Sequence, residues 1–290
     1  MSISNEQFKQ ERLQAIITDR HSGAAELGRL ALQAAADYSR ICEKNDAKSL
    51  LEDFLIFAEA LKEARPSMAT VVNLVESWSQ WLRSEGTDDP EQLRAVALNT
   101  ALDLISQSTD AVSQIAAHVE QLIETDSTVL THSYSSTVMA CFQSLAAKNV
   151  RAIFSESRPG GEGLRVAHKL VEFAISAEYI TDAQLGLFVP LAHAVLIGAD
   201  SILADGSVVN KAGTKLLALA ARDAGVPLYV CTESFKLSQR KFDDIQLEEM
   251  DGAELGLPNL PHITARNIYF DVTPAELITA WVNEHGVHKS

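Results

Sequence analysis

The chain has 290 residues, and a composition with 47% hydrophobic and 22% charged residues allows a substantial buried core and excludes a disordered or fibrous protein. Its 24 Lys and Arg against 39 Asp and Glu give a net charge of −15, which disfavours direct binding to nucleic acid or to an anionic membrane surface. At roughly 150 residues per domain, this length predicts about two domains.

The amino-terminal half predicts a helical domain over residues 1–124, because apolar residues recur three or four apart from Glu6 to about Glu124. We expect a first helix to end near Ser22-Gly23, a second helix over about residues 24–42 and a third over roughly residues 47–64. The buried face of the second helix is expected to include Leu27, Leu30, Leu32 and Ala35.

Two prolines mark helix boundaries in the rest of this half. Pro66 is expected to stop the third helix and to open the next one. Asp89 precedes Pro90, an order typical of a cap followed by the first residue of a helix, so we expect a long final helix there and a loop at residues 85–87.

After Asp126, short β-branched and apolar runs alternate with helical stretches, which predicts an α/β fold with a mostly parallel sheet, covered on both faces, over residues 125–290. The expected strands are residues 128–131, 152–154, 194–197, 228–231 and 268–272. Residues 241–261 form a long excursion before the last of these. Such sheets bind ligands in the loops that follow the carboxyl ends of their strands.

The first such loop, residues 131–137, carries five Ser and Thr side chains and His132 at the start of a helix, which suits an anion. Alternatively, Ser135 or Ser136 only caps that helix. No G-x-S-x-G motif is present, which argues against a hydrolase triad built on Ser133 and His132. For His132 we expect a hydrogen bond to the loop backbone.

The second loop, residues 156–163, joins Arg158 to a glycine-rich turn before a helix, and such a guanidinium can bind phosphate oxygens in a fork. It is neither a Walker A loop nor G-x-G-x-x-G, so a surface turn with a solvated Arg158 is the alternative.

The third loop, residues 198–214, places Asp200 at the end of an apolar strand, where a low dielectric tends to raise a carboxyl pKa and makes proton transfer possible. Asn210 and Lys211 are expected to begin the next helix. There the Asn210 side-chain amide could bind a hydroxyl group of a ligand, and the Lys211 ammonium could bind a phosphate. A plain helix cap or ion-pair partner is the other interpretation of Asp200.

Metal and disulfide chemistry are not indicated. The histidines are dispersed, the three cysteines share no C-x-x-C spacing, and we expect no metal and no cofactor. The cysteines are Cys42, Cys141 and Cys231. No signal peptide is apparent, and the most apolar stretch, residues 185–199, is interrupted by Pro190 and His193, so we expect a cytoplasmic protein without a membrane segment.

Several of these segments occur together, in this order, in one known family. They are Ser22-Gly23-Ala24, Arg65-Pro66, Leu130-Thr131-His132, Glu156-Ser157-Arg158-Pro159, Gly198-Ala199-Asp200, Asn210-Lys211-Ala212-Gly213-Thr214, Glu233-Ser234-Phe235-Lys236 and residues 270–278. Over nearly its whole length the chain resembles the family that unites the α, β and δ regulatory subunits of eukaryotic translation initiation factor 2B with ribose-1,5-bisphosphate isomerase and methylthioribose-1-phosphate isomerase.

The resemblance implies a helical amino-terminal domain, a Rossmann-like carboxyl-terminal domain, a homodimer or larger oligomer formed through the latter, and a sugar-phosphate pocket between the domains. It implies that Asp200 corresponds to the proton donor of the isomerases. The substrate-binding positions that it implies are Ser22, Gly23, Ala24, Arg65, Arg158, Glu162, Asn210 and Lys211.

The chain departs from the isomerases at three positions. Ser133 stands where they carry a catalytic cysteine, Ser22 where they carry an arginine, and Glu162 where they carry a glutamine. A thiol titrates near pKa 8.5 and its pKa can be lowered by its surroundings, whereas an aliphatic hydroxyl keeps its proton without a dedicated base. Glu162 also adds negative charge where a phosphorylated sugar would approach.

Three hypotheses follow. The first is a regulatory or weakly catalytic protein that binds a phosphorylated sugar or nucleotide. The second is an aldose–ketose isomerase of a sugar phosphate, an intramolecular oxidoreductase, which the retained Asp200 favours. The third is a structural subunit with a vestigial pocket.

Overall fold

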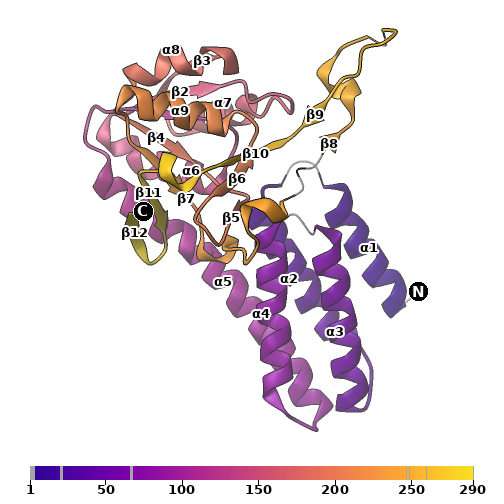
Figure 1. Ribbon diagram of the computed structural model, residues 1–290. Helices are drawn as coiled ribbons and strands as arrows, with labels where there is room; N and C mark the ends of the chain where they lie inside the picture. Colours follow the sequence, from indigo (N-terminus) through magenta and orange to yellow (C-terminus); the bar gives the residue numbers. More distant parts are fainter. Residues whose placement is uncertain are drawn as a thin grey trace. The chain divides into compact units, whose positions relative to one another are not determined.

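The structure is a computed structural model that describes residues 4–19, 22–65, 68–245, 247, 249–258 and 260–289 (Figure 1). The chain divides into two compact units, Met1–Asp110 and Ala111–Ser290. The change from helices to alternating strands and helices falls between the last residue of helix α5, Leu122, and the first residue of strand β1, Thr128.

The first unit is built from helices. They are α1 (Asn5–Thr18), α2 (Ala24–Ile41), α3 (Ala47–Ala64), α4 (Ala69–Glu85) and α5 (Pro90–Leu122), the last of which continues into the second unit. The Asp89 carboxylate accepts a hydrogen bond of 3.0 Å from the Glu91 amide, so the predicted start of α5 is confirmed. Helix α1 ends at Thr18, earlier than predicted, and Pro66 lies outside the described residues.

The core of the helical unit contains fully buried aromatic side chains of α2, α3 and α4, among them Trp78, Tyr38, Phe54 and Phe57. The prediction for α2 is confirmed at Leu27, Leu32 and Ala35, which are fully buried, but is wrong at Leu30, which is 44% exposed. A helix turns about 100° per residue, so Leu30 lies about 200° around the helix from Leu32 and faces away from the core.

The second unit contains a seven-stranded sheet with the order β12-β11-β7-β4-β1-β2-β3, in which every neighbouring pair is parallel except β11 with β12. Four predicted strands are confirmed in it: β1 (Thr128–Thr131), β2 (Arg151–Ser155), β4 (Ala194–Ile197) and β7 (Leu228–Cys231). The α/β fold with a mostly parallel sheet is therefore confirmed.

Three strands of this sheet were not predicted: β3 (Ser176–Ile180), β11 (Ala280–Asn283) and β12 (Gly286–Lys289). Strand β3 lies at the sheet edge, where four of its five residues are exposed, so it lacks the apolar run that identified the central strands. Strand β12 is likewise an exposed edge strand.

The last predicted strand, residues 268–272, is wrong as a member of the large sheet. It divides into β9 (Asn267–Ile268), which pairs with β8 (Glu249–Met250), and β10 (Phe270–Thr273). Strand β10 runs antiparallel to β6 (Val208–Lys211), and β6 also pairs with β5 (Ser201–Ile202), which makes a separate three-stranded sheet. In Figure 1 the segment with β8 and β9 extends away from the large sheet.

Helices cover both faces of the large sheet, as predicted. Alternate residues of the central strands, such as Val129 and Leu196, pack with the last part of α5, with α6 (Ser136–Leu145) and with α7 (Gly163–Glu172). The intervening residues, such as Leu130 and Val195, pack with α8 (Leu185–Phe188) and α9 (Thr214–Ala224). This alternation explains why the buried strands appear in the sequence as continuous apolar runs.

Candidate functional site

Polar side chains meet at the carboxyl edge of the large sheet, where the loops after β1, β2 and β4 lie next to one another. The Ser133 amide of the first loop donates a 2.8 Å hydrogen bond to Ser157 Oγ of the second. A Cβ atom added to Gly198 of the third loop would lie 2.6 Å from Ser135 Oγ of the first. The three loops that the sequence singled out therefore form one cluster.

His132 joins the first loop to the start of α9. Its Nε2 atom lies 2.9 Å from the Ala212 carbonyl oxygen, and its Nδ1 atom lies 2.7 Å from Ser155 Oγ. Because a carbonyl only accepts, Nε2 carries a proton and donates it to Ala212. The expected hydrogen bond from His132 to the loop backbone is confirmed. A Cβ on Gly213, whose φ is +106°, would lie 2.9 Å from Nε2, so this approach requires glycine.

Ser133 is buried and has a φ of +66°, in the left-handed region that side chains rarely adopt. Its Oγ donates a hydrogen bond to Glu162 Oε2, which comes from the residue directly before α7. The Tyr134 amide donates to the same oxygen at 3.2 Å. The backbone conformation thus directs the Ser133 hydroxyl to Glu162.

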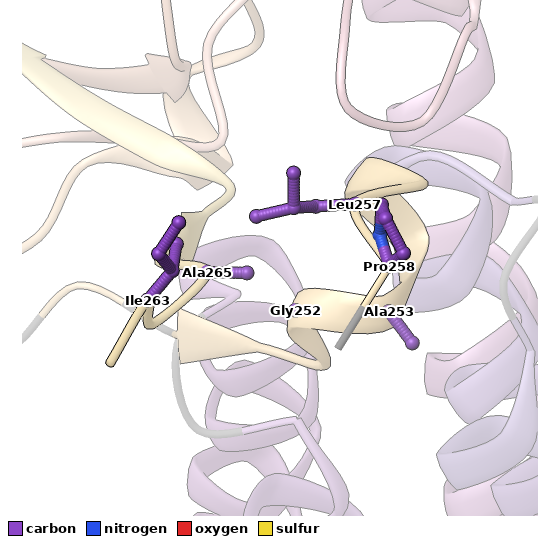
Figure 2. A pocket seen from close by; sticks show the side chains of 6 residues that line it. All are labelled: Gly252, Ala253, Leu257, Pro258, Ile263 and Ala265. Carbon is purple, nitrogen blue, oxygen red and sulfur yellow. The ribbon is translucent and has the colours of Figure 1, made fainter. Parts of the chain in front are cut away.

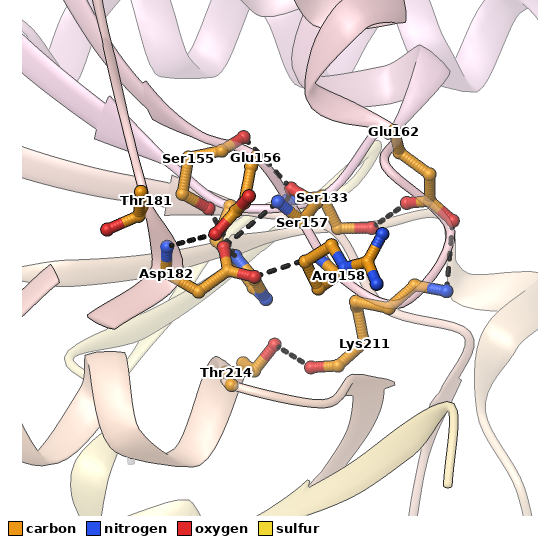
Figure 3. Close-up of polar contacts among 12 residues, drawn as sticks. Ser133, Ser155, Glu156, Ser157, Arg158, Glu162, Thr181, Asp182, Lys211 and Thr214 are labelled. Atoms are coloured by element: carbon orange, nitrogen blue, oxygen red, sulfur yellow. Dashed lines mark hydrogen bonds and ion pairs between the residues drawn. The ribbon is translucent and has the colours of Figure 1, made fainter. Parts of the chain in front are cut away.

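The other oxygen of Glu162 forms an ion pair with Lys211, with 2.9 Å between Oε1 and Nζ (Figure 3). Burial by itself would raise the pKa of Glu162, but the Lys211 ammonium and the hydrogen bonds from Ser133 and Tyr134 together lower it below its ordinary value. Glu162 is therefore a carboxylate at neutral pH, held by three donors.

Lys211 lies in a strand, which corrects the prediction that Asn210 and Lys211 begin a helix. Both belong to β6 and pair with Asp271 and Phe270 of β10, and α9 starts only at Thr214, after Gly213. The Lys211 side chain is 5% exposed, and its ammonium lies 4.3 Å from the centre of the Tyr269 ring. The side-chain amide of Asn210 donates from Nδ2 to Thr214 Oγ1 at 3.0 Å, across the turn into α9.

Asp271 is a site residue to which sequence reasoning assigned no role. Its carboxylate accepts from the Gly213 amide at 2.8 Å and from the Lys215 amide at 3.1 Å, so β10 caps the amino terminus of α9. Burial raises the pKa of Asp271 above its ordinary value, against the effect of these amides. No local pattern could identify a cap that comes from more than 50 residues further along the chain.

Asp200 is half-buried and comes shortly after β4, as predicted. Its amide donates to the Val209 carbonyl at 2.9 Å, so it lies beside β6, one residue from Asn210 on that strand. The structure thus brings Asp200 next to the strand that carries Asn210 and Lys211.

The second loop is held by Asp182, which follows β3 and was also not predicted. Its carboxylate accepts from the Ser157 amide at 2.9 Å and from the Arg158 amide at 2.7 Å. Arg158 is exposed, and in Figure 3 its side chain points toward Ser133, Glu162 and Lys211. The second loop, which contacts the Ser133 amide through Ser157 Oγ, thus carries an exposed guanidinium.

Ser135 has the structural role that the sequence left open. Its Oγ accepts from the Val138 amide at 3.3 Å and caps α6, whose first residue is Ser136. At the end of β7, Glu233 accepts from Thr137 Oγ1 at 2.8 Å and pairs with Lys236 at 3.3 Å, with both charged side chains buried. These contacts connect α6 to the sheet edge.

Four predicted binding residues lie in the helical unit, around the end of α1. The Ser22 amide donates to Asp19 Oδ1 at 2.8 Å, Gly23 is the cap residue of α2, and Ala24 is its first residue. The Arg65 guanidinium donates to the carbonyl groups of Ile16, at 3.1 Å, and Asp19. These contacts connect the ends of α1 and α3, and a ligand-binding role for the four residues stays a prediction.

A hollow of about 330 Å³ lies elsewhere, on the segment with β8 and β9 (Figure 2). It is lined by Gly252, Ala253, Leu257, Pro258, Ile263 and Ala265, and these offer no titratable group for chemistry. Within the described ranges, no three His, Cys, Asp or Glu side chains are placed to hold a metal ion, and no helix is long and apolar enough to cross a membrane.

The chain has relatives of two kinds. The family model described as "Initiation factor 2 subunit family" matches residues 20–290. A putative translation initiation factor eIF-2B subunit 2-like protein of Pyrococcus horikoshii is 35% identical over 262 residues, which cover 89% of each chain. Ribose 1,5-bisphosphate isomerase of Haloferax volcanii is 29% identical over 272 residues, 91% of this chain and 83% of that one.

Solved structures agree with these matches. The crystal structure of the Pyrococcus horikoshii translation initiation factor eIF-2B has a TM-score of 0.83 at 31% identity and covers 97% of this chain and 96% of its own. The 5-methylthioribose 1-phosphate isomerase of the same organism has a TM-score of 0.81 at 21% identity, covering 97% and 84% of the two chains, which is a likeness of fold alone.

Proposed function

The chain belongs to the initiation factor 2 subunit family, and we propose that it binds a phosphorylated sugar or nucleotide at the carboxyl edge of its sheet in a regulatory or weakly catalytic role. The observation that carries this proposal is the hydrogen bond from Ser133 to Glu162, which is itself paired with Lys211. By resemblance, Ser133 stands at the position of the isomerases' catalytic thiol.

The Ser133 hydroxyl, with Glu162 as its partner, is unsuited to replace a catalytic thiolate. An aliphatic hydroxyl keeps its proton at neutral pH unless a strong base removes it. Glu162 is a weak base here, because its pKa lies below the ordinary value. The arrangement supports a binding site more strongly than it supports the family's thiol-dependent chemistry.

Binding of a phosphate is supported by the groups next to this contact. The exposed Arg158 can hold phosphate oxygens in a fork, and its loop is kept in place by Asp182. Asn210 on β6 offers an amide that can bind a sugar hydroxyl. These donors come from different loops, so only the folded sheet edge presents them together.

The test is a proton and phosphorus NMR time course with ribose 1,5-bisphosphate, methylthioribose 1-phosphate and ribose 5-phosphate, with saturation transfer recorded in the same samples. We expect saturation transfer from at least one of these compounds without conversion, and weaker transfer with Arg158→Ala. Isomerised product at enzymatic rates contradicts the proposal. Arg151→Ala, which removes an exposed arginine at the opposite end of β2, is the matched control.

An aldose–ketose isomerase is the second candidate, and the placement of Asp200 favours it. The Asp200 amide bonds to Val209, so the Asp200 backbone lies beside β6, the strand that carries Asn210 and Lys211, and a carboxyl group there suits a proton donor. If this candidate is correct, Asp200→Asn abolishes turnover and leaves binding intact. Unchanged turnover in that variant excludes it.

We also propose that the protein works in the cytoplasm as a homodimer or larger oligomer joined through the sheet-bearing unit. The three cysteines are free, which fits a reducing compartment. Leu187 and Leu191, in α8 and the short turn after it, and Leu216 and Leu219 of the neighbouring α9 are 40–69% exposed. Light scattering of the wild type and of Leu187→Glu tests this: a monomer in both contradicts it.

A further inference from the structure

We propose that Glu162 determines which ligands the site accepts: its carboxylate occupies an anion subsite, so the protein binds ligands with one phosphate and rejects those with a second phosphate at that subsite. This inference rests on the proposed function, because it requires that a phosphorylated ligand binds at this edge of the sheet. It specifies how many phosphate groups the ligand carries, which the proposed function leaves open.

The subsite has the donors that an external anion would need. A hydroxyl, a backbone amide and an ammonium group converge on one carboxylate: Ser133 Oγ and the Tyr134 amide on Oε2, and Lys211 Nζ on Oε1 (Figure 3). Phosphate groups are bound by the same three kinds of donor. The Glu162 carboxylate therefore stands where a phosphate oxygen could otherwise be held.

The charges of the subsite are already balanced. The Lys211 side chain is 5% exposed, against 26% for Glu162, so the ammonium is the more enclosed partner of the ion pair. A phosphate that reached Lys211 would have to displace a carboxylate that already bonds to three donors, or lie beside it with like charge. Both are unfavourable.

The backbone around Glu162 keeps the carboxylate in place. The next residue, Gly163, lies so close to the end of β2 that an added Cβ would be 2.4 Å from the Ser155 carbonyl oxygen. The Gly163 amide also donates to the Glu156 carbonyl at 3.1 Å. The three donors therefore become free for a ligand only when the Glu162 side chain rotates away, because the backbone of this loop is held in place.

The same helix supplies a matched control. Glu172 is the last residue of α7, is exposed and forms a local ion pair of 2.7 Å with Lys169. Glu172→Gln removes the same charge from the same helix and leaves the site unchanged. Glu162→Gln keeps the shape and the acceptor oxygen of the side chain and removes its charge. Glu162→Asp keeps the charge on a shorter side chain.

The experiment is titration calorimetry of the full chain with ribose 5-phosphate and ribose 1,5-bisphosphate, two probes that differ by one phosphate. The wild type and Glu162→Asp should bind ribose 5-phosphate more tightly than the bisphosphate. Glu162→Gln should raise the affinity for the bisphosphate by about tenfold or more, as the loss of one close like charge predicts. Its affinity for ribose 5-phosphate and both affinities of Glu172→Gln should stay within about threefold of the wild type.

The outcomes separate this inference from the proposed function. If the wild type binds the bisphosphate as tightly as Glu162→Gln does, the site binds phosphorylated ligands but Glu162 does not select among them. If Glu162→Gln loses both ligands while folding normally, Glu162 contacts the ligand directly and the inference is wrong. If no variant binds either probe, the proposed function fails as well.

Discussion

Two buried clusters of the molecule consist of the same groups, a lysine, a carboxylate and a hydroxyl donor, and they differ in their surroundings. In the helical unit, Asp53 accepts from the Tyr38 hydroxyl and pairs with Lys9 at 3.3 Å. In the sheet unit, Glu162 accepts from Ser133 and pairs with Lys211 at 2.9 Å. In both clusters burial would raise the pKa of the carboxyl group, but the hydroxyl and ammonium partners together lower it below its ordinary value.

The Asp53 cluster joins three helices. Lys9 belongs to α1, Tyr38 to α2 and Asp53 to α3, and the Tyr38 ring packs against Phe54 and Phe57. Helix α1 buries only two residues, Lys9 and Ile16, so this polar cluster supplies much of its attachment. Its role is structural.

The Glu162 cluster is formed by groups that follow β1, precede α7 and end β6, and the loop of the exposed Arg158 is bonded to Ser133 through Ser157. The Glu162 side chain is 26% exposed, against 12% for Asp53. The comparison shows that the same ionic chemistry joins three helices in one unit and lies among the loop ends of the candidate binding site in the other.

The largest expected effect is that of Asp53→Ala, which leaves the Tyr38 hydroxyl buried without its acceptor and leaves Lys9 with the exposed Glu6 as its remaining partner. We expect a loss of about 3–5 kcal/mol in the free energy of unfolding, measured by urea denaturation, with faster hydrogen exchange in α1. Glu52→Ala, the exposed neighbour on the same helix, should change little. A loss below about 1 kcal/mol would contradict the structural role.

Glu162→Ala removes the carboxylate of the second cluster and shows whether the two clusters contribute differently to stability. Because the Glu162 side chain is 26% exposed, against 12% for Asp53, we expect a smaller loss, of about 1–3 kcal/mol in the free energy of unfolding, and no change in the exchange of α1. Glu172→Ala is the control. Equal losses from Asp53→Ala and Glu162→Ala would show that the two clusters do not differ in the way proposed.

Removing the hydroxyl donor should also destabilise the protein more in the Asp53 cluster than in the Glu162 cluster, with smaller losses of unfolding free energy. Tyr38→Phe should cost about 1–1.5 kcal/mol of unfolding free energy, because it removes one hydrogen bond to a buried charge, and Ser133→Ala about 0.5–1 kcal/mol. The measurement is again urea denaturation, with Ser136→Ala, in the first turn of α6, as the control for Ser133. A larger loss for Ser133→Ala than for Tyr38→Phe would reverse the comparison.

The smallest expected effect is in the acid dependence of stability. Burial alone would raise the pKa of Asp53, but the Tyr38 hydroxyl and the Lys9 and Lys44 ammonium groups lower it below its ordinary value of 3.8. A lowered pKa means that the stabilisation is present above pH 3.8 and is lost as the pH falls through the folded-state value. Asp53→Asn should therefore lose less unfolding free energy than the wild type between about pH 5 and pH 2.

The measurement compares urea midpoints of the wild type and Asp53→Asn over this pH range. Glu162→Gln should behave in the same way, since its pKa is also lowered, starting from an ordinary value of 4.5. Parallel pH profiles of the wild type and Asp53→Asn would show that Asp53 is not held ionised by its partners.

The sequence predicted the central strands well and the edges poorly. Strands β1, β4 and β7 have the predicted bounds, because a strand buried on both faces needs an uninterrupted apolar run. The edge strand β3 has no such run, since four of its five residues face solvent. The pair Asn210 and Lys211 was assigned to a helix because its strand partner, β10, lies about 60 residues further along the chain.

By itself, the sequence determined the fold class, the family and the three loops that form the candidate site, because apolar periodicity and short motifs are local properties of the chain. It also identified Ser133, Glu162 and Lys211 as candidates. Only the tertiary structure decided that these three bind one another and that Asp182 and Asp271 hold the loops around them. Contacts across 25 to 80 residues depend on strand order and register, which no local pattern encodes.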